Sequence, residues 1–558
     1  MRNFDFVRDT LPSVHTDCAR AESYLQSDPR SACFYSRRAV EELVAHLYDV
    51  LGLPRPYQDD LAGRINDMAF KAKTGVAIGQ KLNLIRRLGN LAVHGAKPIP
   101  PQTALQALRE LHHVAVWAAF RYSRHPQSVP TRAQFDPALA AKAAPLSRQE
   151  LVNLAAKFKA RDEAHAKAVA SKDDLLAAHE AEIAALREQI KAAQAANTKP
   201  DDHDYSEAET RDLFIDVLLA EAGWPLSETR DREYEVSGMP NKQGTGFIDY
   251  VLWGADGLPL AVVEAKRTTK SAMLGQQQAA LYADRLEQQF GRRPVIFYTN
   301  GYQHWIWDDV AGYPPREVQG FYTRDELELM IQRRRTRLQL TEAAVNTGIV
   351  ERPYQFRAIK AVGEAFDAKQ REALLVMATG AGKTRTVIAL VEQLMKANWV
   401  KRVLFLVDRT ALVIQATNAF KAHLPAATTV NLVTEKVADG RVYVSTYPTM
   451  LNLINEVDEG GRRFGPGYFD LIVIDEAHRS VYAKYGAIFD YFDGMLIGLT
   501  ATPKDEVDHN TYGLFHLEDG VPTDAYSLDE AVAEGYLVRQ RVSRSARSSC
   551  ARASGTPT

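Results

Sequence analysis

The chain has 558 residues, 46% hydrophobic and 25% charged, with a formal net charge of −2. A single hydrophobic core rarely grows beyond about 250–300 residues, so this length predicts about three or four domains. Because the net charge is nearly zero, a nucleic-acid partner would have to be held by local basic patches. The apolar runs, such as residues 403–407, are far shorter than the ~20 residues that cross a bilayer, so we expect no membrane association.

The amino terminus carries neither the apolar stretch nor the cleavage site of a secretory signal. The cysteines Cys18, Cys33 and Cys550 lie far apart, without the spacing of a metal site. We therefore expect a reducing, cytoplasmic location.

Residues 1–126 are predicted to form an all-α module, because apolar residues recur at helical spacing in 39–47 and 105–114. Residues 127–200 are predicted to be a linker and a long exposed helix, since 146–196 is rich in Ala, Glu, Lys and Gln and contains no Gly or Pro. This helix is either a solvated spacer or a coiled-coil contact, and its imperfect apolar repeat favours the spacer.

A β-hairpin is predicted early in the next domain, residues 201–340, where strands 246–253 and 260–266 flank a turn. Glu264 and Lys266 are two residues apart and share a face, and strand pairing brings Asp249 toward them. Two carboxylates suit Mg²⁺, which lowers the pKa of a bound water, while Lys266 can orient that water or stabilise the developing charge. The chemistry would be phosphodiester hydrolysis, although the same three side chains are also compatible with a solvated hairpin face.

This arrangement resembles the PD-(D/E)xK nucleases, and the spacing of Gln278 and Tyr282 resembles the Gln-x-x-x-Tyr motif of the RecB-like and type I restriction branch. The resemblance implies metal binding by Asp249 and Glu264, catalysis by Lys266, and supporting roles for Gln278 and Tyr282.

Two points of this assignment stay open. Gln276 and Gln277 leave the register of the glutamine uncertain. Glu209, on the preceding helix, is either a further acidic member of the site or a surface glutamate.

An ATP-binding lobe is predicted over residues 345–540. Strand 373–377 leads into a glycine-rich loop, 378–384, whose backbone N–H groups can approach phosphate oxygens, and helix 385–396 adds its positive end. Strand 470–474 then delivers an Asp-Glu-Ala-His sequence, 475–478. The expected ATP-binding residues are Gln355, Thr379, Gly380, Ala381, Gly382, Lys383, Thr384 and Asp475.

Within this set, Lys383 would neutralise the β and γ phosphates, and Thr384 and Asp475 would bind Mg²⁺. Glu476 is the expected catalytic residue, because it can polarise the attacking water. Met377 stands where many phosphate-binding loops have their first glycine.

The order of these motifs resembles that of superfamily 2 motors, in which Met377 would be an ordinary departure. The resemblance implies a RecA-like parallel sheet, with residues 352–355 near the adenine. It also implies DNA contact or coupling to hydrolysis by Arg409, Thr446, Thr500 and Thr502.

A nuclease followed by a motor, over about residues 1–540, resembles the R subunit of type I restriction enzymes. The resemblance implies an α/β multidomain chain that uses ATP and Mg²⁺ to translocate and cleave double-stranded DNA, with specificity and methyltransferase subunits as partners. Two alternatives remain: a stand-alone helicase-nuclease of DNA repair, and a non-catalytic DNA-binding or subunit-docking remnant.

Two further segments lead to expectations of their own. Arg86, Arg87 and His94 resemble the signature of HEPN-like domains, some of which are ribonucleases, but a protein-binding module is the favoured interpretation. Residues 541–558 have no apolar period and are predicted to be an irregular, truncated or out-of-frame tail. Because such motors use a second lobe, we expect weak ATP binding and inefficient turnover unless a partner supplies that lobe.

Overall fold

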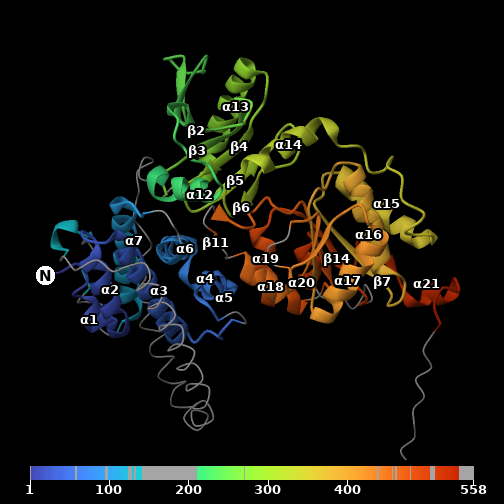
Figure 1. Cartoon of the computed structure of the whole chain (residues 1–558), viewed down its shortest axis with the longest axis horizontal. Helices are drawn as coiled ribbons and strands as arrows, with labels where there is room; N and C mark the ends of the chain where they lie inside the picture. The colour runs from blue at the N-terminus through green and yellow to red at the C-terminus, as the bar shows by residue number, and fades with distance from the viewer. Residues whose placement is uncertain are drawn as a thin grey trace, which may run out of the picture.

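The computed structural model has three parts: a helical module, a six-stranded sheet domain and a seven-stranded sheet domain (Figure 1). The long helix expected within 146–196, Glu209, His478 and the tail 541–558 lie outside the described residues. The described residues are 2–56, 59–94, 98–123, 129–130, 134–140, 210–268, 270–435, 439–454, 457–458, 461–477, 479–502 and 509–538. Among them, no helix combines the length and apolar character needed to cross a membrane.

The amino-terminal module is helical, as its apolar spacing predicts. Its central helix α3 contacts α2, α6 and α7, and the apolar faces of these helices form one core. Asp28 caps α3 by accepting from the backbone N–H of Ser31, and Gly52 ends it in the left-handed conformation at φ +61°. The helices are α1 (Val7–Thr10), α2 (Pro12–Tyr24), α3 (Pro29–Leu51), α4 (Leu61–Asn66), α5 (Met68–Thr74), α6 (Val76–His94) and α7 (Pro101–Tyr122).

The six-stranded sheet has the order β1-β2-β3-β4-β5-β6, with β3 and β4 parallel and the other neighbours antiparallel. The expected hairpin is β2 and β3, so this prediction is confirmed. The strands are β1 (Arg232–Ser237), β2 (Thr245–Trp253), β3 (Pro259–Ala265), β4 (Val295–Thr299), β5 (His304–Trp307) and β6 (Arg316–Val318).

Helices cover both faces of this sheet. One face packs against α13 (Gln276–Phe290), and the other packs against α12 (Asp216–Glu221) and α14 (Arg324–Thr336). Because β3 lies inside the sheet and is covered on both faces, all seven of its residues are buried. The buried strand therefore fixes where its polar residues point.

The second sheet is parallel throughout, with the order β15-β7-β14-β13-β8-β10-β9. Its interior strands are mainly apolar and lie between two hydrophobic clusters, as expected for a doubly wound sheet. The strands are β7 (Glu372–Met377), β8 (Val403–Val407), β9 (Thr429–Asn431), β10 (Val442–Thr446), β13 (Leu471–Asp475), β14 (Met495–Thr500) and β15 (Asp524–Tyr526); β11 (Val457–Asp458) and β12 (Gly461–Arg462) form a separate hairpin.

The helices of this domain follow the crossover pattern that the sequence predicts. The helix after the glycine-rich loop begins at Lys383, two residues earlier than expected. The helices are α15 (Pro353–Asp367), α16 (Lys383–Lys396), α17 (Thr410–His423), α18 (Tyr447–Leu453), α19 (Arg479–Tyr491), α20 (His509–Leu514) and α21 (Leu528–Ala533).

Buried ion pairs join the two sheet domains. Asp493, before β14, accepts hydrogen bonds from Arg316 of β6, from Tyr322 and from Arg371. Arg333 of α14 pairs with Asp470. Asp470 was expected to begin a strand, but β13 begins one residue later, because the Asp470 carboxylate accepts from Arg333 and from the backbone of Lys401.

Candidate nuclease and ATP sites

The β2–β3 hairpin brings the predicted nuclease residues together. Tyr250 faces Val263 in the antiparallel register, which places the preceding residue, Asp249, opposite Glu264. Asp249 Oδ2 accepts a hydrogen bond of 2.7 Å from the Ala265 backbone N–H. Lys266 Nζ donates to Glu264 Oε1 at 2.6 Å. Glu264 is only 2% exposed, which argues against a solvated hairpin face.

A hydrogen-bonded chain extends from Lys266 into α13. Lys266 Nζ also donates to Gln278 Oε1 at 3.1 Å, and Gln278 Nε2 donates to the Tyr282 hydroxyl at 2.9 Å. The geometry therefore selects Gln278 among the three consecutive glutamines. Burial raises the pKa of Tyr282, so this hydroxyl stays protonated at neutral pH.

Two glycines allow the surrounding elements to approach this cluster. A Cβ atom on Gly246 would lie 2.8 Å from the Tyr282 ring, and one on Gly275 would lie 3.2 Å from Glu264 Cγ. Any larger residue at position 246 would push α13 away from β2. The close packing of α13 against the hairpin thus depends on these two positions.

Arg211 is a member of this cluster that the sequence did not predict. It lies in the π-helix η4 (Arg211–Ile215) and donates to Asp249 Oδ1 at 2.8 Å and to Glu233 Oε1 at 2.9 Å. Single π-helical turns occur often at functional sites, because they reorient one side chain. No sequence motif marked this residue, since it lies 38 positions from its carboxylate partner.

The donor set fits a hard divalent cation. Mg²⁺ is commonly held by one or two carboxylates together with water and substrate phosphate. Asp249 and Glu264 supply two carboxylates on neighbouring strands, and no group of three or more His, Cys, Asp or Glu side chains forms a metal cluster among the described residues. Two carboxylates of this kind therefore fit magnesium.

The ATP site lies where parallel strands end at one edge of the second sheet. The loop after β7 leads into α16, and Lys383 Nζ lies 3.1 Å from Oε1 of Glu476, which follows β13. Burial raises the pKa of Asp475, and the nearby Lys383 lowers it in part. Glu476 adopts a positive φ of +57°, an uncommon conformation that turns the chain sharply after the strand.

The loop conformation requires glycine at two positions. Gly380 and Gly382 have φ values of +86° and +85°, and a Cβ atom on Gly382 would lie 2.8 Å from Gln355 Nε2. Gln355 is thus placed directly against the loop, as the expected nucleotide contact requires. Of the remaining loop residues, Thr379 is exposed, Ala381 is buried and Thr384 is half-buried.

Two tyrosines support this loop: Tyr354 lies in the segment that the sequence placed near the adenine, but neither its contact with the loop nor the role of Tyr526 was predicted. Tyr354 donates its hydroxyl proton to the Ala381 carbonyl at 2.8 Å, and its ring stacks on Tyr526 with a centroid separation of 3.8 Å. The Tyr526 carbonyl accepts from the Ala378 N–H at the start of the loop. β15 therefore fixes the loop, although it lies about 150 residues away along the chain.

The predicted coupling residues lie at the same sheet edge. Thr446 ends β10 and its side chain caps α18, and Thr500 ends β14 and accepts from the Thr502 N–H. Arg409 stands just before α17 without a side-chain cap hydrogen bond. The Arg409 side chain is 81% exposed and Thr500 is fully buried. These four residues therefore lie at or just after the carboxyl ends of three parallel strands, at the edge of the sheet where the loop also follows β7.

Comparisons with known proteins agree with this division of the chain. Residues 232–314 match the family model described as type I restriction enzyme R protein N terminus, and residues 348–505 match type III restriction enzyme, res subunit. The endonuclease subunit of the Escherichia coli type I restriction enzyme EcoAI is 33% identical over 366 residues, which are 61% of this chain and 44% of that protein. The chain is a homologue of the R subunits of type I restriction enzymes.

Other comparisons define how far this relationship extends. The EcoKI endonuclease subunit from Escherichia coli strain K12 is 26% identical over an alignment that covers 96% of this homologue and 55% of that subunit. This R-subunit homologue therefore spans about half the length of the curated relatives it matches. The Pyrococcus furiosus Hef helicase domain is 27% identical over 31% of this chain and 38% of that chain, but its TM-score of 0.24 is too low to relate the two folds.

The helical module of the R-subunit homologue matches a domain of unknown function over residues 19–149. Arg87 of α6 pairs with the buried Glu221 of α12 at 3.5 Å, and Glu221 also pairs with Arg462 of β12 at 2.9 Å. Arg86 donates to Asn83, and the His94 side chain lies outside the described part. Arg87 therefore connects the module to the first sheet domain directly and, through Glu221, to Arg462 of the second.

Proposed function

We propose that this chain is the nuclease and motor subunit of a type I restriction enzyme, cleaving duplex DNA with Mg²⁺ after ATP-dependent translocation. The observation that carries this proposal is the joining of two lysine–carboxylate sites, Lys266 with Glu264 and Lys383 with Glu476, in two domains of one chain. Homology to R subunits supports the same combination.

In the nuclease domain, Asp249 and Glu264 would hold Mg²⁺, which supplies an activated water and neutralises phosphate charge when bound. Lys266 Nζ is held beside the Glu264 carboxylate, because Glu264 and Gln278 both accept from it. From there it can donate to a phosphate oxygen as negative charge develops. Tyr282 holds Gln278 in the rotamer that this contact needs.

The nuclease proposal can be tested with supercoiled plasmid and Mg²⁺. We expect the Lys266→Ala variant to nick DNA about 10²–10³-fold more slowly, the usual cost of removing one preorganised donor. Lys270→Ala is the matched control, because Lys270 has an exposed side chain in the same loop. Equal rates in the parent and in Lys266→Ala, or no magnesium-dependent nicking in the parent, would remove the proposal.

In the motor domain, Lys383 would exchange its contact with Glu476 for the phosphates of ATP. Release of Glu476 would then leave its carboxylate able to accept a proton from the attacking water. Thr384 and Asp475 would hold the magnesium ion that accompanies the nucleotide. Gln355 would contact the adenine, and Arg409, Thr446, Thr500 and Thr502 would link the nucleotide to DNA.

Nucleotide binding is the direct test of this part. A fluorescent ATP analogue should bind the parent chain, and Lys383→Ala should weaken that binding at least tenfold. Lys396→Ala, at the exposed end of the same helix, is the control and should leave binding unchanged. Unchanged binding by Lys383→Ala would contradict the assignment.

The partners we propose are the specificity and methyltransferase subunits of a restriction complex. The alternative, a stand-alone helicase-nuclease of DNA repair, requires neither. Co-purification from the native host separates the two: recovery with a DNA methyltransferase supports the restriction subunit, and recovery without one supports the repair enzyme.

A further inference from the structure

A cavity of about 300 Å³ lies at the junction of the two sheet domains, away from both candidate sites. Its walls come from the segment after β5, from α14 and the chain after it, and from the segments around β7 and Trp399. The cavity thus has one wall in each domain. A ligand bound there would contact the nuclease and the motor together.

Basic side chains outnumber acidic ones around this cavity. Asp308 and Asp367 are the carboxylates that line it. Two carboxylates outside the lining, Asp493 and Asp470, pair with its arginines. Four carboxylates therefore face six cations. The cations are Arg316, Arg333, Arg334, Arg337, Lys369 and Arg371.

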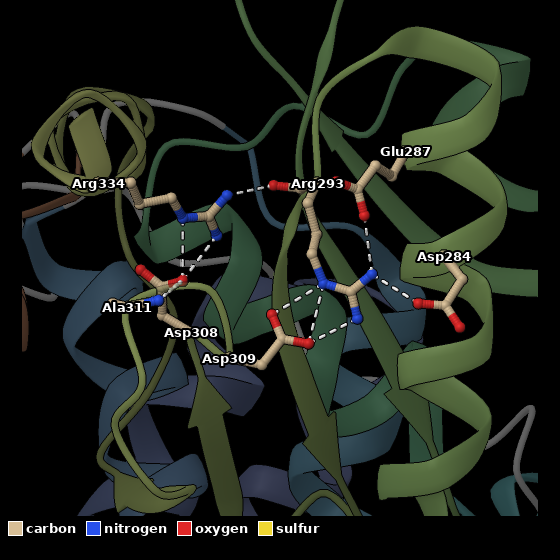
Figure 2. A network of polar contacts seen from close by, with 7 residues as sticks. All are labelled: Asp284, Glu287, Arg293, Asp308, Asp309, Ala311 and Arg334. Carbon is tan, nitrogen blue, oxygen red and sulfur yellow. Dashed lines mark hydrogen bonds and ion pairs between the residues drawn. The ribbon is translucent and has the colours of Figure 1, made fainter.

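Most of these cations are already held in place. Figure 2 shows Arg334 bonded to Asp308 and to the Arg293 carbonyl, beside a second network in which Arg293 pairs with Asp309, Asp284 and Glu287. Arg316 and Arg371 share Asp493. The arginine positions are therefore fixed by protein contacts before any ligand arrives.

Arg337 differs from these residues. Its Nε atom is buried without a hydrogen-bond acceptor, as is that of Arg333, but Arg333 pairs with Asp470, whereas neither Arg337 nor Lys369 pairs with a carboxylate within the described part of the chain. The Arg337 guanidinium lies over the Trp399 ring at 4.7 Å, a contact that supplies no acceptor. Burial is the main cause that lowers the pKa of Arg337; Tyr313 and Asp470 raise this pKa, and Arg333 and Arg371 lower it. An anion in the cavity would supply the negative partner that Arg337 lacks.

The chemistry of the wall limits what that anion can be. Trp399 and Tyr313 are nearly buried, and cations already cover their rings: Arg337 lies over Trp399, and Lys369 lies over Tyr313 at 5.2 Å. Because both rings are buried, they offer a nucleobase no exposed face to stack on, whereas guanidinium groups bind phosphate oxygens well. We propose that the cavity binds a phosphate group, either free inorganic phosphate or a backbone phosphate of DNA, and that Arg337 and Lys369 are its main contacts.

Calorimetric titration with inorganic phosphate tests this proposal on the full chain. The titrations use a Lys383→Ala background, so that the glycine-rich loop does not contribute. We expect phosphate binding that weakens at least tenfold when Arg337→Ala is added and is unchanged when Arg335→Ala is added. Arg335 is the matched control, because it is an exposed arginine two residues away.

Lys369→Ala is a second test variant that should fold normally, because Lys369 is exposed and its removal leaves the ion pairs between the domains intact. It should weaken phosphate binding severalfold while the melting temperature stays constant. Absence of phosphate binding in the Lys383→Ala background, or equal affinities with Arg337→Ala and Arg335→Ala, would overturn the proposal.

A short DNA duplex distinguishes the two sources of phosphate. If the duplex displaces phosphate and loses affinity in Arg337→Ala, the occupant is a DNA backbone phosphate. If the duplex leaves phosphate bound, the occupant is the free ion.

Discussion

The nuclease and ATP sites are each built around a lysine–glutamate pair, but the two pairs differ in burial. In the nuclease pair, Glu264 has a side-chain exposure of 3% and its partner Lys266 also contacts α13. In the ATP pair, the Glu476 side chain is 44% exposed. The nuclease pair is therefore held by its surroundings, whereas the ATP pair can separate easily.

This difference follows from where the two sites lie. Glu264 lies inside a strand that helices cover on both faces, so its rotamer is fixed by packing. Glu476 lies in a turn after a strand, as expected for ligand sites at the carboxyl ends of parallel strands. We expect the nuclease site to be ready before substrate arrives and the ATP site to be completed by its nucleotide.

Removing the charge of Glu264 or of Glu476 should have the largest effects, and the effects should differ between the two sites. Glu264→Gln should reduce plasmid nicking about 10²–10³-fold, because it removes a magnesium ligand charge and loosens Lys266. Glu476→Gln should preserve ATP binding while reducing hydrolysis by about the same factor, because only water activation is lost. The nicking rate measures the first effect, and analogue binding and phosphate release measure the second. Loss of ATP binding in Glu476→Gln would show that the ATP site is also preformed.

The junction between the domains should respond to loss of Asp493. Asp493→Ala leaves Arg316 and Arg371 without their shared carboxylate, and breaking such a buried pair costs about 3–5 kcal/mol of unfolding free energy. Denaturant unfolding should show this loss, together with separate transitions for the two domains. Glu518→Ala, at an exposed position, is the control. If Asp493→Ala loses no more unfolding free energy than this control, the role of Asp493 in joining the two domains is contradicted.

The same carboxylate predicts a pH dependence. Burial raises the pKa of Asp493, but Arg316 and Arg371 outweigh it and hold this pKa below its usual range. A lowered folded-state pKa gives stability that is present above the unfolded-state pKa of about 4 and is lost as the pH falls through the folded value. Asp493→Asn should therefore lose less stability than the parent between pH 5 and pH 3.

Arg211 should have a smaller effect, confined to the nuclease site. Its ion pair with Asp249 competes with a metal ion for the same carboxylate. Arg211→Ala should lower the half-saturating magnesium concentration roughly fivefold, corresponding to on the order of 1 kcal/mol for a partly exposed pair. Magnesium titration of nicking measures this shift, with Arg292→Ala as the remote control. A higher magnesium requirement would mean that Arg211 organises the site instead.

The smallest expected effect concerns the ATP loop. Tyr354→Phe keeps the stacking on Tyr526 but removes the hydroxyl that donates to Ala381. One neutral hydrogen bond contributes about 0.5–1.5 kcal/mol, so analogue affinity should fall about threefold. A change of tenfold or more would indicate direct contact between this tyrosine and the nucleotide.

Local patterns predicted the parts of both sites that are close in sequence. The alternating residues of β2 and β3 predicted the hairpin, and the glycine-rich loop after a buried strand predicted α16, although this helix begins two residues earlier than expected. These elements depend on short-range periodicity and turn chemistry, which a sequence displays directly.

Contacts between distant segments were not predictable in the same way. Arg211, Tyr526 and Asp493 reach their partners across 38, 172 and 177 residues, and no local pattern reveals these contacts. The role of Gln278 lay between these cases: the spacing to Tyr282 suggested it, but only the contact with Lys266 distinguished it from its two neighbours.

Anomalous scattering from crystals grown with Mn²⁺ and without nucleotide tests the central claim most directly. We predict a manganese peak in contact with the Asp249 and Glu264 carboxylates, because that site is preformed, and no peak at Thr384 and Asp475 until an ATP analogue is added. A peak only at the glycine-rich loop, or manganese absent from the hairpin while the parent chain still cuts DNA, would contradict the assignment of the nuclease site.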